Sequence, residues 1–493
     1  MLLSLLALWL LATLGVRPLL LPDEGRYANV AREMLRSGDW LVPTLNGLPF
    51  FHKPPLMYWL DIAAMQLLGA TPFAGRFASM LGAWIMAATL FFAMRRWHGV
   101  RAATAALLLI ASCPLFFLAG QYANHDMLVG ALIGAAILAF ARAVDEDATH
   151  VSRRWLIAGW GLCAVAMLAK GLIGIVLPAL VIGPWLLARG RWRQLLKLLH
   201  PLGLVTFAVI ALPWFVAMQS RYGGFNDYFF MEQHFRRYAL KSFNNAHPFW
   251  FFIVVLPLLT LPWSAWLPAA LRRAWQERTR AIVALYLWWV VAVVGFFSLP
   301  SSKLVGYVLP ALAPWCALLA LAVAGDVPDD RPTLLSRAPR AALAIGLLIC
   351  LGVVAGLAWK TPKSNRGAAL ALAAQIAPHD SVVMVEEYFY DLPFYADLKR
   401  PAIIASHWDD PELPLHDNWR KELFDAARFD LARGQQVLRP LAQLDALTCG
   451  RGNVWFVALP AEAATRVAVL RGAQRVYADA SSELWRVPAR ACP

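Results

Sequence analysis

Acidic and cationic side chains stand close together in the segment from residue 22 to residue 55. Asp23 follows Pro22 and opens the run DEGRY, and Lys53 stands in the run HKPP. A carboxylate can orient or deprotonate a nucleophile, and a lysine or an arginine can hold a phosphate. Because a departing phosphate needs its developing charge neutralised, this combination favours group transfer from a phosphate-linked donor.

The pattern around Asp23 also has a purely structural explanation. Apolar side chains at helical spacing between residues 24 and 37 predict an amphipathic helix that lies on a membrane and is closed by Gly38. Asp23 after Pro22 suits the N-cap of that helix. From the residue types alone, capping and catalysis both remain open. The apolar face consists of Tyr27, Val30, Ala31, Met34 and Leu35.

Similar side chains recur at or just inside the ends of apolar stretches. A charge in such a place costs free energy unless it has a partner or a function. Each one alone is explained by snorkelling towards the membrane surface. Ten from different segments, all on one predicted side, instead favour a shared polar cavity that suits a lipid-linked phosphate. The ten are Asp23, Glu24, Arg26, Lys53, Arg76, Asp126, Lys170, His234, Arg237 and Lys303.

Composition determines the class of protein that must position these side chains. The chain has 493 residues, of which 60% are hydrophobic and 15% charged. Soluble domains contain about 25% charged residues, and repeated long apolar stretches are typical of a membrane. The mean hydropathy of +0.54 agrees. We therefore expect a polytopic integral membrane protein and exclude a secreted mini-protein, a disordered tail and a cytosolic enzyme.

Eleven apolar stretches predict membrane spans, although several fall short of about 20 residues. The first of them has no basic residue before it and no small-residue cleavage site, so we expect a retained span rather than a cleaved signal. The stretch 56–70 is short, carries Asp61 and is predicted to be an interfacial helix. The spans are 2–16, 74–94, 102–118, 127–141, 155–169, 171–188, 200–218, 249–270, 281–297, 304–324 and 341–359.

Basic residues predict the orientation of the spans. Five alternate loops (95–101, 142–154, 189–199, 271–280 and 325–340) hold 17 Lys and Arg in 57 residues, against 11 in 102 residues for the other set. The richer set is cytoplasmic by the positive-inside rule. The N-terminus is then inside and the C-terminus outside. The net charge of +14 reflects this topology and anionic lipid rather than nucleic acid, because no basic domain has interleaved aromatic residues.

The composition changes after about residue 361. Charges become dense, and β-rich runs such as VVMVEE and NVWFVAL alternate with helical ones such as GAALALAAQIA. We expect a small external α/β domain over 361–493, after a transmembrane domain over 1–360. Cys449 and Cys492 are the two cysteines of this domain and are predicted to form a disulfide. The other four, at 113, 163, 316 and 350, are expected to be small apolar side chains.

Longer runs of sequence resemble a known family. The segment from PDEGRYANVAREMLRSGDW to HKPPLMYW resembles the signature loop of the bacterial aminoarabinose lipid A transferases. These are multi-span GT-C-type glycosyltransferases, related to protein O-mannosyltransferases, that use polyprenyl-phosphate sugars. Further similar runs are YANHDMLVG (122–130), LAKGLIGIVLP (168–178), LPWFVAM (212–218), EQHFRRY (232–238), HPFWFFIVVLP (247–257), SSKLVGYVLP (301–310) and EEYFYDLPFYADLKRP (386–401).

The resemblance implies roles for individual residues. Asp23 matches the family's proposed catalytic carboxylate, and Asp126 matches a second acidic position at the cavity; both are predicted to be catalytic. Lys53 matches a lysine that contacts the carrier phosphate. Arg237 matches an arginine on the phosphate side, with His234 one helical turn before it. The predicted substrate-binding set is completed by Glu24, Arg26, Tyr27, Arg76 and Lys303.

The resemblance also implies thirteen spans, with three between the SSKL helix and the external domain. Only one apolar stretch, 341–359, stands there in this chain. An external C-terminus is preserved, but surface that could help to shape acceptor binding is absent from the predicted set of spans.

The predicted reaction is transfer of one sugar, a pentose or a hexose, from undecaprenyl phosphate to an acceptor at the periplasmic face of the inner membrane. Inversion is implied by the family, with lipid A or another envelope glycan as acceptor. Two alternatives remain: a hydroxyl acceptor, as for protein O-mannosyltransferases, and a non-catalytic transporter of the carrier. A divalent cation at the Asp and His cluster is left open, and the expected state is a monomer without nucleic acid.

Overall fold

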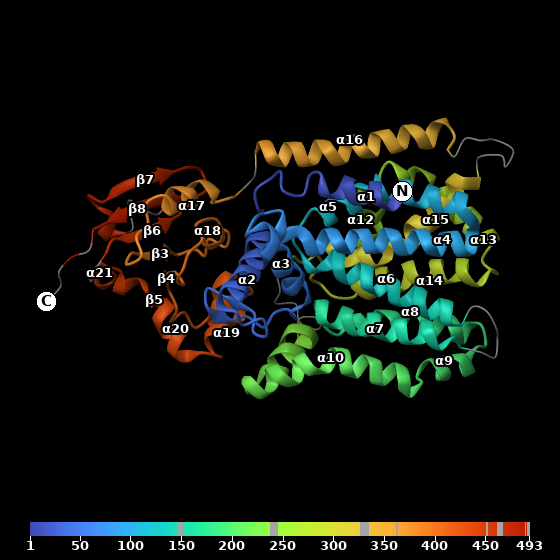
Figure 1. The fold of residues 1–493 in the computed structure, drawn as a ribbon, viewed down its shortest axis with the longest axis horizontal. Coiled ribbons are helices and arrows are strands. Elements are labelled where there is room, and N and C mark those ends of the chain that lie inside the picture. The colour runs from blue at the N-terminus through green and yellow to red at the C-terminus, as the bar shows by residue number, and fades with distance from the viewer. Residues whose placement is uncertain are drawn as a thin grey trace.

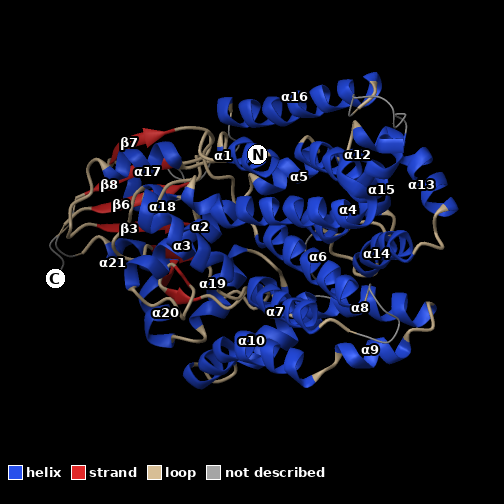
Figure 2. Cartoon of the chain, turned by 45° about the vertical axis from the view of Figure 1, so that its right-hand side comes forward, coloured by secondary structure: helices blue, strands red, loops and turns tan. Residues whose placement is uncertain are grey.

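The computed structural model describes residues 1–144, 151–236, 245–325, 335–360, 363–449, 452–460, 467–488 and 490. Figure 1 shows a bundle of long helices beside a sheet with short helices, with α2 (Asp23–Ser37) and α3 (Leu56–Leu68) between them. In Figure 2 the strands of the larger sheet again lie at one end of the bundle. The junction between the two parts is formed by the first external loop.

The bundle is made of the apolar helices that the long apolar stretches predict. Its centre is α6 (His125–Ala143) and the continuous pair η4 (Val305–Ala311) and α15 (Leu312–Gly325), which are almost wholly buried. The outer helices α10 (Pro201–Arg221) and α16 (Arg337–Trp359) expose leucine and valine side chains, which suits contact with lipid. The other elements are α1 (Leu2–Leu11), α4 (Phe77–Ala111), α5 (Pro114–Gly120), α7 (Arg153–Lys170), α8 (Ile173–Ala188), α9 (Trp192–Leu198), the π-helix η2 (Asp227–Arg236), α12 (Phe251–Leu259), η3 (Trp263–Trp266), α13 (Leu267–Gln276) and α14 (Ala281–Ser298).

A helix lies at each of the eleven apolar stretches, but the count of crossings stays a prediction. Among the described residues, six helices are long and apolar enough to cross a membrane. A seventh would be the pair Phe251–Leu259 and Trp263–Gln276, which is bent by 110°. Shorter apolar helices such as α1 and α8 have 10 and 16 residues, below the length that spans a bilayer without help.

Two predicted spans, 74–94 and 102–118, overlap α4; the first begins in η1 (Ala74–Arg76) and the second continues into α5. Gly99 has φ 87° and ψ 175°, which breaks the helical backbone between them. Arg76 before the break and Ala123 after it both donate hydrogen bonds to Glu24, so the chain leaves one end of the bundle and returns to it. Glycine is required at the reversal because side chains rarely tolerate this conformation.

The predicted cytoplasmic loops gather at the end of the bundle opposite the sheet, where Figure 1 places α9 and α13. Arg280 donates to the carbonyl oxygen of Trp97 at 3.2 Å, which joins the loops 271–280 and 95–101. Arg191 donates to the carbonyl oxygen of Val144 at 3.3 Å and joins 189–199 to 142–154. Four of the five basic loops therefore share one end.

The prediction for the first external loop is confirmed only in part. α2 is a helix closed by Gly38 in the left-handed conformation. The prediction that α2 lies on a membrane surface is wrong, because even its polar residues Asn29 and Arg32 are buried. Periodicity identifies the apolar face of a helix but not what covers the other face. Here the C-terminal domain covers it. After α2 come the hairpin β1 (Thr44–Leu45) and β2 (Leu48–Pro49), then α3 and η1 (Ala74–Arg76).

The C-terminal part is a six-stranded sheet in the order β5-β4-β3-β6-β8-β7. The four strands β5, β4, β3 and β6 are parallel. β4, β3 and β6 are largely buried, as expected for strands covered by helices on both faces, whereas the edge strand β5 is partly exposed. β8 and β7 continue the sheet antiparallel. The strands are β3 (Ser381–Val385), β4 (Ile403–Ser406), β5 (Leu438–Pro440), β6 (Val454–Ala458), β7 (Gln474–Ala478) and β8 (Glu483–Val487); the helices are α17 (Arg366–Ala373), α18 (Leu392–Tyr395), η5 (Leu413–Leu415), α19 (Trp419–Ala427), α20 (Leu431–Val437), η6 (Leu441–Gln443), α21 (Leu444–Leu447) and η7 (Ala468–Leu470).

This sheet domain docks on the first external loop. Asn46 at the tip of the β1–β2 hairpin donates to the carbonyl oxygen of Ala402 at 2.8 Å and accepts from its N–H at 2.9 Å. Asn46 and Gly47 have φ of 53° and 74°, the turn conformation for which the pair Asn-Gly is favoured. The N–H of Leu19 in this loop also donates to the hydroxyl oxygen of Tyr395 in the sheet domain, at 2.7 Å. The loop thus joins bundle and sheet.

Candidate active site

Glu24 is a fully buried carboxylate at a junction of four segments. Arg76 donates to it with Nε at 2.7 Å and Nη2 at 3.1 Å, and Arg17 forms a second ion pair. The N–H groups of Leu20 and Ala123 donate at 2.7 and 2.9 Å. Burial raises the pKa of Glu24, but the two guanidinium groups outweigh this effect and lower the pKa to about 2.

Arg76 likewise forms its hydrogen bonds within the protein. Its remaining N–H groups donate to the carbonyl oxygens of Leu14, Arg17 and Pro18 at 2.7 to 3.0 Å. All five donors of the guanidinium group are then used. The prediction that Glu24 and Arg76 bind substrate does not agree with this geometry, because neither has polar capacity left. Both act as positioning residues that hold the start of α2 against the bundle.

Asp23 is the first residue of α2, and its side chain is 28% exposed. The helix has no side-chain cap, so the capping explanation is wrong. Arg26 donates with Nη1 to Oδ1 of Asp23 at 2.9 Å. Its Nη2 atom lies 3.0 Å from Oε1 of Glu422 on α19, and the guanidinium carbon lies 4.7 Å from the ring centre of Tyr390. The C-terminal domain therefore helps to orient Asp23.

Asn124 connects the two predicted catalytic carboxylates. Its Nδ2 atom donates to Oδ2 of Asp23 at 3.4 Å, while its Oδ1 atom accepts from the N–H of Asp126 at 3.1 Å as the cap of α6. The hydroxyl of Tyr122 also lies 3.4 Å from Oδ2 of Asp23. Because both contacts to Oδ2 are long, this oxygen retains capacity to accept a proton or a hydroxyl.

Asp126 forms an ion pair with Lys170 at the end of α7. The ammonium nitrogen of Lys170 also lies 4.7 Å from the ring centre of Tyr307. The backbone of Gly306 packs against the carboxylate, since a Cβ atom at this position would lie 2.2 Å from Oδ2 of Asp126. Three helices therefore set the position of Asp126.

His125 lies between the two aromatic side chains of Tyr27 and Tyr58, with ring centroids 4.6 and 5.4 Å away. It is fully buried, and neither ring nitrogen has a hydrogen-bond partner among the described residues. Lys53 and Lys170 are close enough for their charges to act on the imidazole. Tyr27 therefore packs beside the start of α6, and the charge of Lys53 acts on His125 there.

The described hydrogen bonds of Lys303 go to backbone carbonyl groups. Its ammonium group donates to the carbonyl oxygens of Pro300, His247 and Ser301, the last two at 2.9 and 3.5 Å, and the residue is buried. The role of Lys303 in substrate binding stays a prediction. The Lys303 side chain joins the loop before α12 to the loop after α14. His234 lies in η2, but its side chain and all of Arg237 lie outside the described residues.

The cysteines agree with the sequence analysis as far as they are described. Cys113, Cys163, Cys316 and Cys350 are free and buried. Cys449 is disulfide-bonded, and its backbone pairs with Arg490. Cys492 lies outside the described residues, so the pairing with Cys492 stays a prediction.

Sequence reasoning missed Asn124, His125, Tyr307, Tyr390 and Glu422. The first four lie inside runs that resemble the family, so the runs themselves were the available signal. Glu422 lies in none of them, and only its contact with Arg26 identifies it. Within the described ranges no group of three His, Cys, Asp or Glu side chains could hold a metal ion. Two carboxylates beside several cations can bind a phosphate-linked donor and orient an acceptor oxygen.

A family model described as dolichyl-phosphate-mannose-protein mannosyltransferase matches residues 52–216. This range holds Lys53, Asp126 and Lys170 but not Asp23 or the sheet domain.

Curated relatives match a longer part of the chain. The undecaprenyl phosphate-alpha-4-amino-4-deoxy-L-arabinose arabinosyl transferase of Aeromonas hydrophila is 36% identical over 380 residues, which are 74% of this chain and 68% of the relative. The protein of that name from Aeromonas salmonicida is 37% identical over 360 residues, or 71% of this chain and 64% of the relative. The matches thus span about two thirds of the relatives' length.

A solved structure shares the fold of the whole chain. The crystal structure of ArnT from Cupriavidus metallidurans bound to undecaprenyl phosphate superimposes with a TM-score of 0.84, covering 100% of this chain and 98% of that one. The sequence identity is 23%, and the apo structure of the same protein gives a TM-score of 0.82. Both the bundle and the sheet domain therefore belong to one shared fold.

Proposed function

This chain belongs to the family of undecaprenyl phosphate-alpha-4-amino-4-deoxy-L-arabinose arabinosyl transferases, and we propose that it is an inverting glycosyltransferase. The donor is a sugar carried on undecaprenyl phosphate, and the acceptor is lipid A or another glycolipid of the cell envelope. The names of the relatives and the carrier bound to the C. metallidurans protein support this donor.

The observation that carries the proposal is the link through Asn124. It holds Asp23 of the first external loop and Asp126 of α6 at one site, although they are 103 positions apart in the sequence. Lys53 and Lys170 lie beside the same site. Carboxylates and cations at the outer end of an apolar bundle match a reaction between two lipid-anchored substrates.

In the proposed reaction an acceptor oxygen attacks the anomeric carbon of the donor sugar. The bond from that carbon to the acceptor oxygen forms as the bond to the phosphate oxygen breaks, with inversion. Asp23 orients the acceptor, and its Oδ2 atom takes the proton where the acceptor is a hydroxyl. A lipid A phosphate is already ionised near neutral pH, so orientation is then the larger contribution. Lys53 and Arg237 stabilise the departing carrier phosphate.

We assign the protein to the bacterial inner membrane, as a monomer with eleven crossings. The N-terminus is then cytoplasmic, and the sheet domain over 361–493 is periplasmic. The gathering of four basic loops at the end opposite the sheet supports this orientation. The single helix α16 between α15 and the sheet domain agrees with an external C-terminus.

A second candidate is transfer to a protein hydroxyl. It is favoured by the match of residues 52–216 to the mannosyltransferase model. The two candidates share the donor chemistry and differ in the acceptor, so acceptor competition separates them.

The test is transfer of a radiolabelled sugar from undecaprenyl phosphate by the purified protein in lipid. Lipid A and a serine- and threonine-rich peptide are offered together as acceptors. Label in lipid A alone is the expected result, and label in the peptide alone supports the second candidate. Movement of the carrier across the bilayer without transfer to either acceptor would show a transporter and overturn the proposal.

A further inference from the structure

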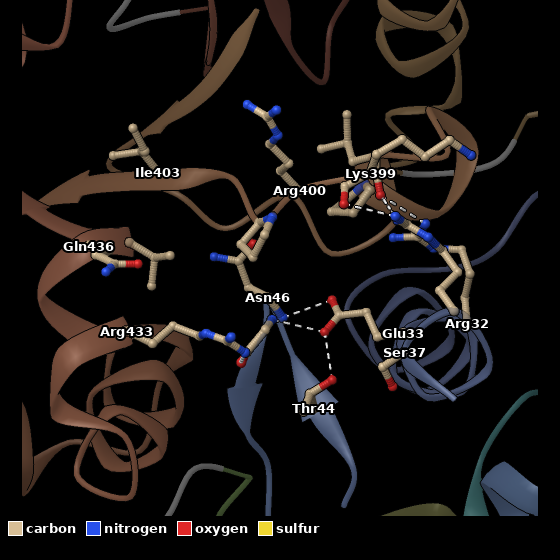
Figure 3. A pocket seen from close by; sticks show the side chains of 16 residues that line it. Arg32, Glu33, Ser37, Thr44, Asn46, Lys399, Arg400, Ile403, Arg433 and Gln436 are labelled. Atoms are coloured by element: carbon tan, nitrogen blue, oxygen red, sulfur yellow. Dashed lines mark hydrogen bonds between the residues drawn. The ribbon is translucent and has the colours of Figure 1, made fainter. Parts of the chain in front are cut away.

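A polar cavity lies at the far end of α2 from Asp23. It has a volume of about 580 Å³ and is enclosed by α2, the β1–β2 hairpin and the sheet domain. Figure 3 shows the side chains around it, with Arg32 and Glu33 on one side and Arg433 and Gln436 on the other. The space exceeds what a small inorganic anion needs and is in the range of pockets that hold a small organic ligand.

The lining is strongly cationic. It includes Arg32, Arg36, Lys399, Arg400 and Arg433, and its one carboxylate is Glu33. Asp397 and Asp430 lie just outside the lining and pair with Arg32, Lys399 and Arg433. Arg36 and Arg400 form no salt bridge among the described residues. The cavity therefore keeps an excess of positive charge.

Glu33 offsets only one of the five positive charges, and hydrogen bonds from α2 and the hairpin hold its carboxylate oxygens. They accept from Nδ2 of Asn29, from the hydroxyl of Thr44 and from the N–H groups of Asn46 and Gly47, each at 2.9 Å. These bonds fix the hairpin against α2, as Figure 3 shows for Thr44 and Asn46. Glu33 thus shapes the cavity wall.

Neutral groups hold the arginines in place. Arg36 donates to the carbonyl oxygens of Leu398 and Lys399, and Arg433 donates to that of Gly47 at 2.9 Å. Carbonyl oxygens orient a guanidinium group without cancelling its charge. Such a preorganised set of donors is suited to a phosphate or a carboxylate.

The rest of the lining suits hydroxyl groups. Ser37, Thr44, Asn46 and Gln436 contribute polar side chains around the cationic ones. We propose that this cavity binds a saccharide that bears a phosphate or a carboxylate. The ligand contacts both the first external loop and the sheet domain, because the walls come from both. It binds apart from Asp23: at about 1.5 Å per helical residue, Arg32 and Arg36 lie roughly 14 and 20 Å along α2.

Direct binding tests the site without any transfer reaction. The full-length protein in detergent is titrated with glucose 6-phosphate, glucuronate, neutral glucose and inorganic phosphate. The two acidic sugars are expected to bind at least about tenfold more tightly than glucose and to weaken with added salt. Equal affinity for glucose would show that the ligand needs no negative charge. Inorganic phosphate that binds as tightly as glucose 6-phosphate would show that the site does not recognise the saccharide. Either result would overturn the proposal.

A double variant, Arg36→Gln with Arg400→Gln, tests whether the ligand binds in this cavity. It is expected to lower the affinity for both acidic sugars about tenfold or more. The matched control is Arg471→Gln, which removes an exposed arginine of the sheet domain outside the cavity. Unchanged affinity in the double variant would overturn the location. Folding of the double variant is checked by its thermal unfolding, and Arg400→Gln alone serves if the double variant is unstable.

Kinetic measurements on the double variant show whether the acidic saccharide is part of the glycolipid acceptor or a free sugar. This experiment rests on the proposed function. If the acidic sugar is part of the glycolipid acceptor, the double variant raises the KM for that acceptor and leaves the KM for the donor unchanged. If only the binding of soluble sugars is lost, the ligand is a free acidic saccharide. A protein that binds acidic sugars but transfers nothing would contradict the proposed function and leave the cavity site intact.

Discussion

Arg26 of the first external loop and Glu422 of the sheet domain form an ion pair with 3.0 Å between Nη2 and Oε1. The same guanidinium group holds Oδ1 of Asp23 at 2.9 Å. The hydroxyl of Tyr390 donates to Oε2 of Glu422 at 2.7 Å, so the carboxylate is itself held in place. Glu422 is therefore a positioning residue for Asp23, supplied by a domain that lies outside the membrane bundle.

We expect Glu422→Gln to lower kcat about tenfold while the KM for the donor stays unchanged. The substitution keeps the shape but removes the charge that orients Arg26, and a buried charge-assisted bond contributes about 1.5–3 kcal/mol. Sugar transfer by the purified variant measures the effect. Glu412→Gln, at an exposed site of the same domain, is the control. Wild-type kcat in Glu422→Gln would show that Arg26 does not need the sheet domain.

Asp23→Asn is expected to abolish turnover while the protein still folds and inserts. Asparagine keeps the size of the side chain and one oxygen that can accept from Arg26, but it loses the charge and the basicity of the carboxylate. Turnover and thermal unfolding are measured together, with the exposed Asp409→Asn as the control. Activity within a few-fold of the wild type would contradict the catalytic assignment.

Gly306→Ala is expected to lower kcat with little change in thermal stability. The added methyl group would lie 2.2 Å from Oδ2 of Asp126, so the carboxylate must shift and its ion pair with Lys170 is disturbed. Gly295→Ala is the matched control, because a Cβ atom there has no neighbour within 4 Å. Equal loss in both variants would point to a helix effect rather than to Asp126.

The buried ion pairs of Glu24 predict that the folded protein loses stability in acid. The pKa of Glu24 is about 2 in the folded protein, below the ordinary value of 4.5. The ionised form therefore stabilises the fold above pH 4.5, and this contribution is lost as the pH falls from 4.5 towards 2. Thermal unfolding in detergent over this range should show the decline. Glu24→Gln should reduce stability by about 3–5 kcal/mol near pH 7, because it leaves Arg17 and Arg76 buried without their partner.

The variant should also flatten the acid dependence between pH 4.5 and 2. Glu232→Gln, which removes a less buried carboxylate, is the control and should leave the slope unchanged. The same slope in Glu24→Gln and in the wild type would mean that other carboxylates cause the decline.

The predicted bridge between Cys449 and Cys492 should appear as a linked peptide in a non-reducing digest. It would close a loop of about 43 residues, which stabilises a fold by roughly 3–4 kcal/mol in the chain-entropy model. Cys449→Ser should lower the unfolding temperature of the sheet domain, whereas Cys163→Ser removes a free cysteine and serves as the control. Alkylation of both Cys449 and Cys492 without prior reduction would contradict the bridge.

Local patterns in the sequence determined the class of the protein and most of its elements. Long apolar stretches mark the helices of the bundle, and short β-branched runs mark β3, β4 and β6, because burial imposes a composition on each segment by itself. The run from Asp23 to Lys53 was long enough to reveal the family, and the relatives confirm that resemblance. This run marked Asp23, and the run YANHDMLVG marked Asp126; the structure brings the two together through Asn124.

Only the tertiary structure decided what each charged side chain does. Glu24, Arg76 and Lys303 are of the residue types expected at a phosphate site. Their side chains nevertheless form their hydrogen bonds with other groups of the protein. Glu422 stands in an ordinary helical run, yet it completes the surroundings of Asp23. The reason is physical: the role of a buried charge depends on which groups satisfy its hydrogen bonds, and those partners lie up to 396 positions away in the chain.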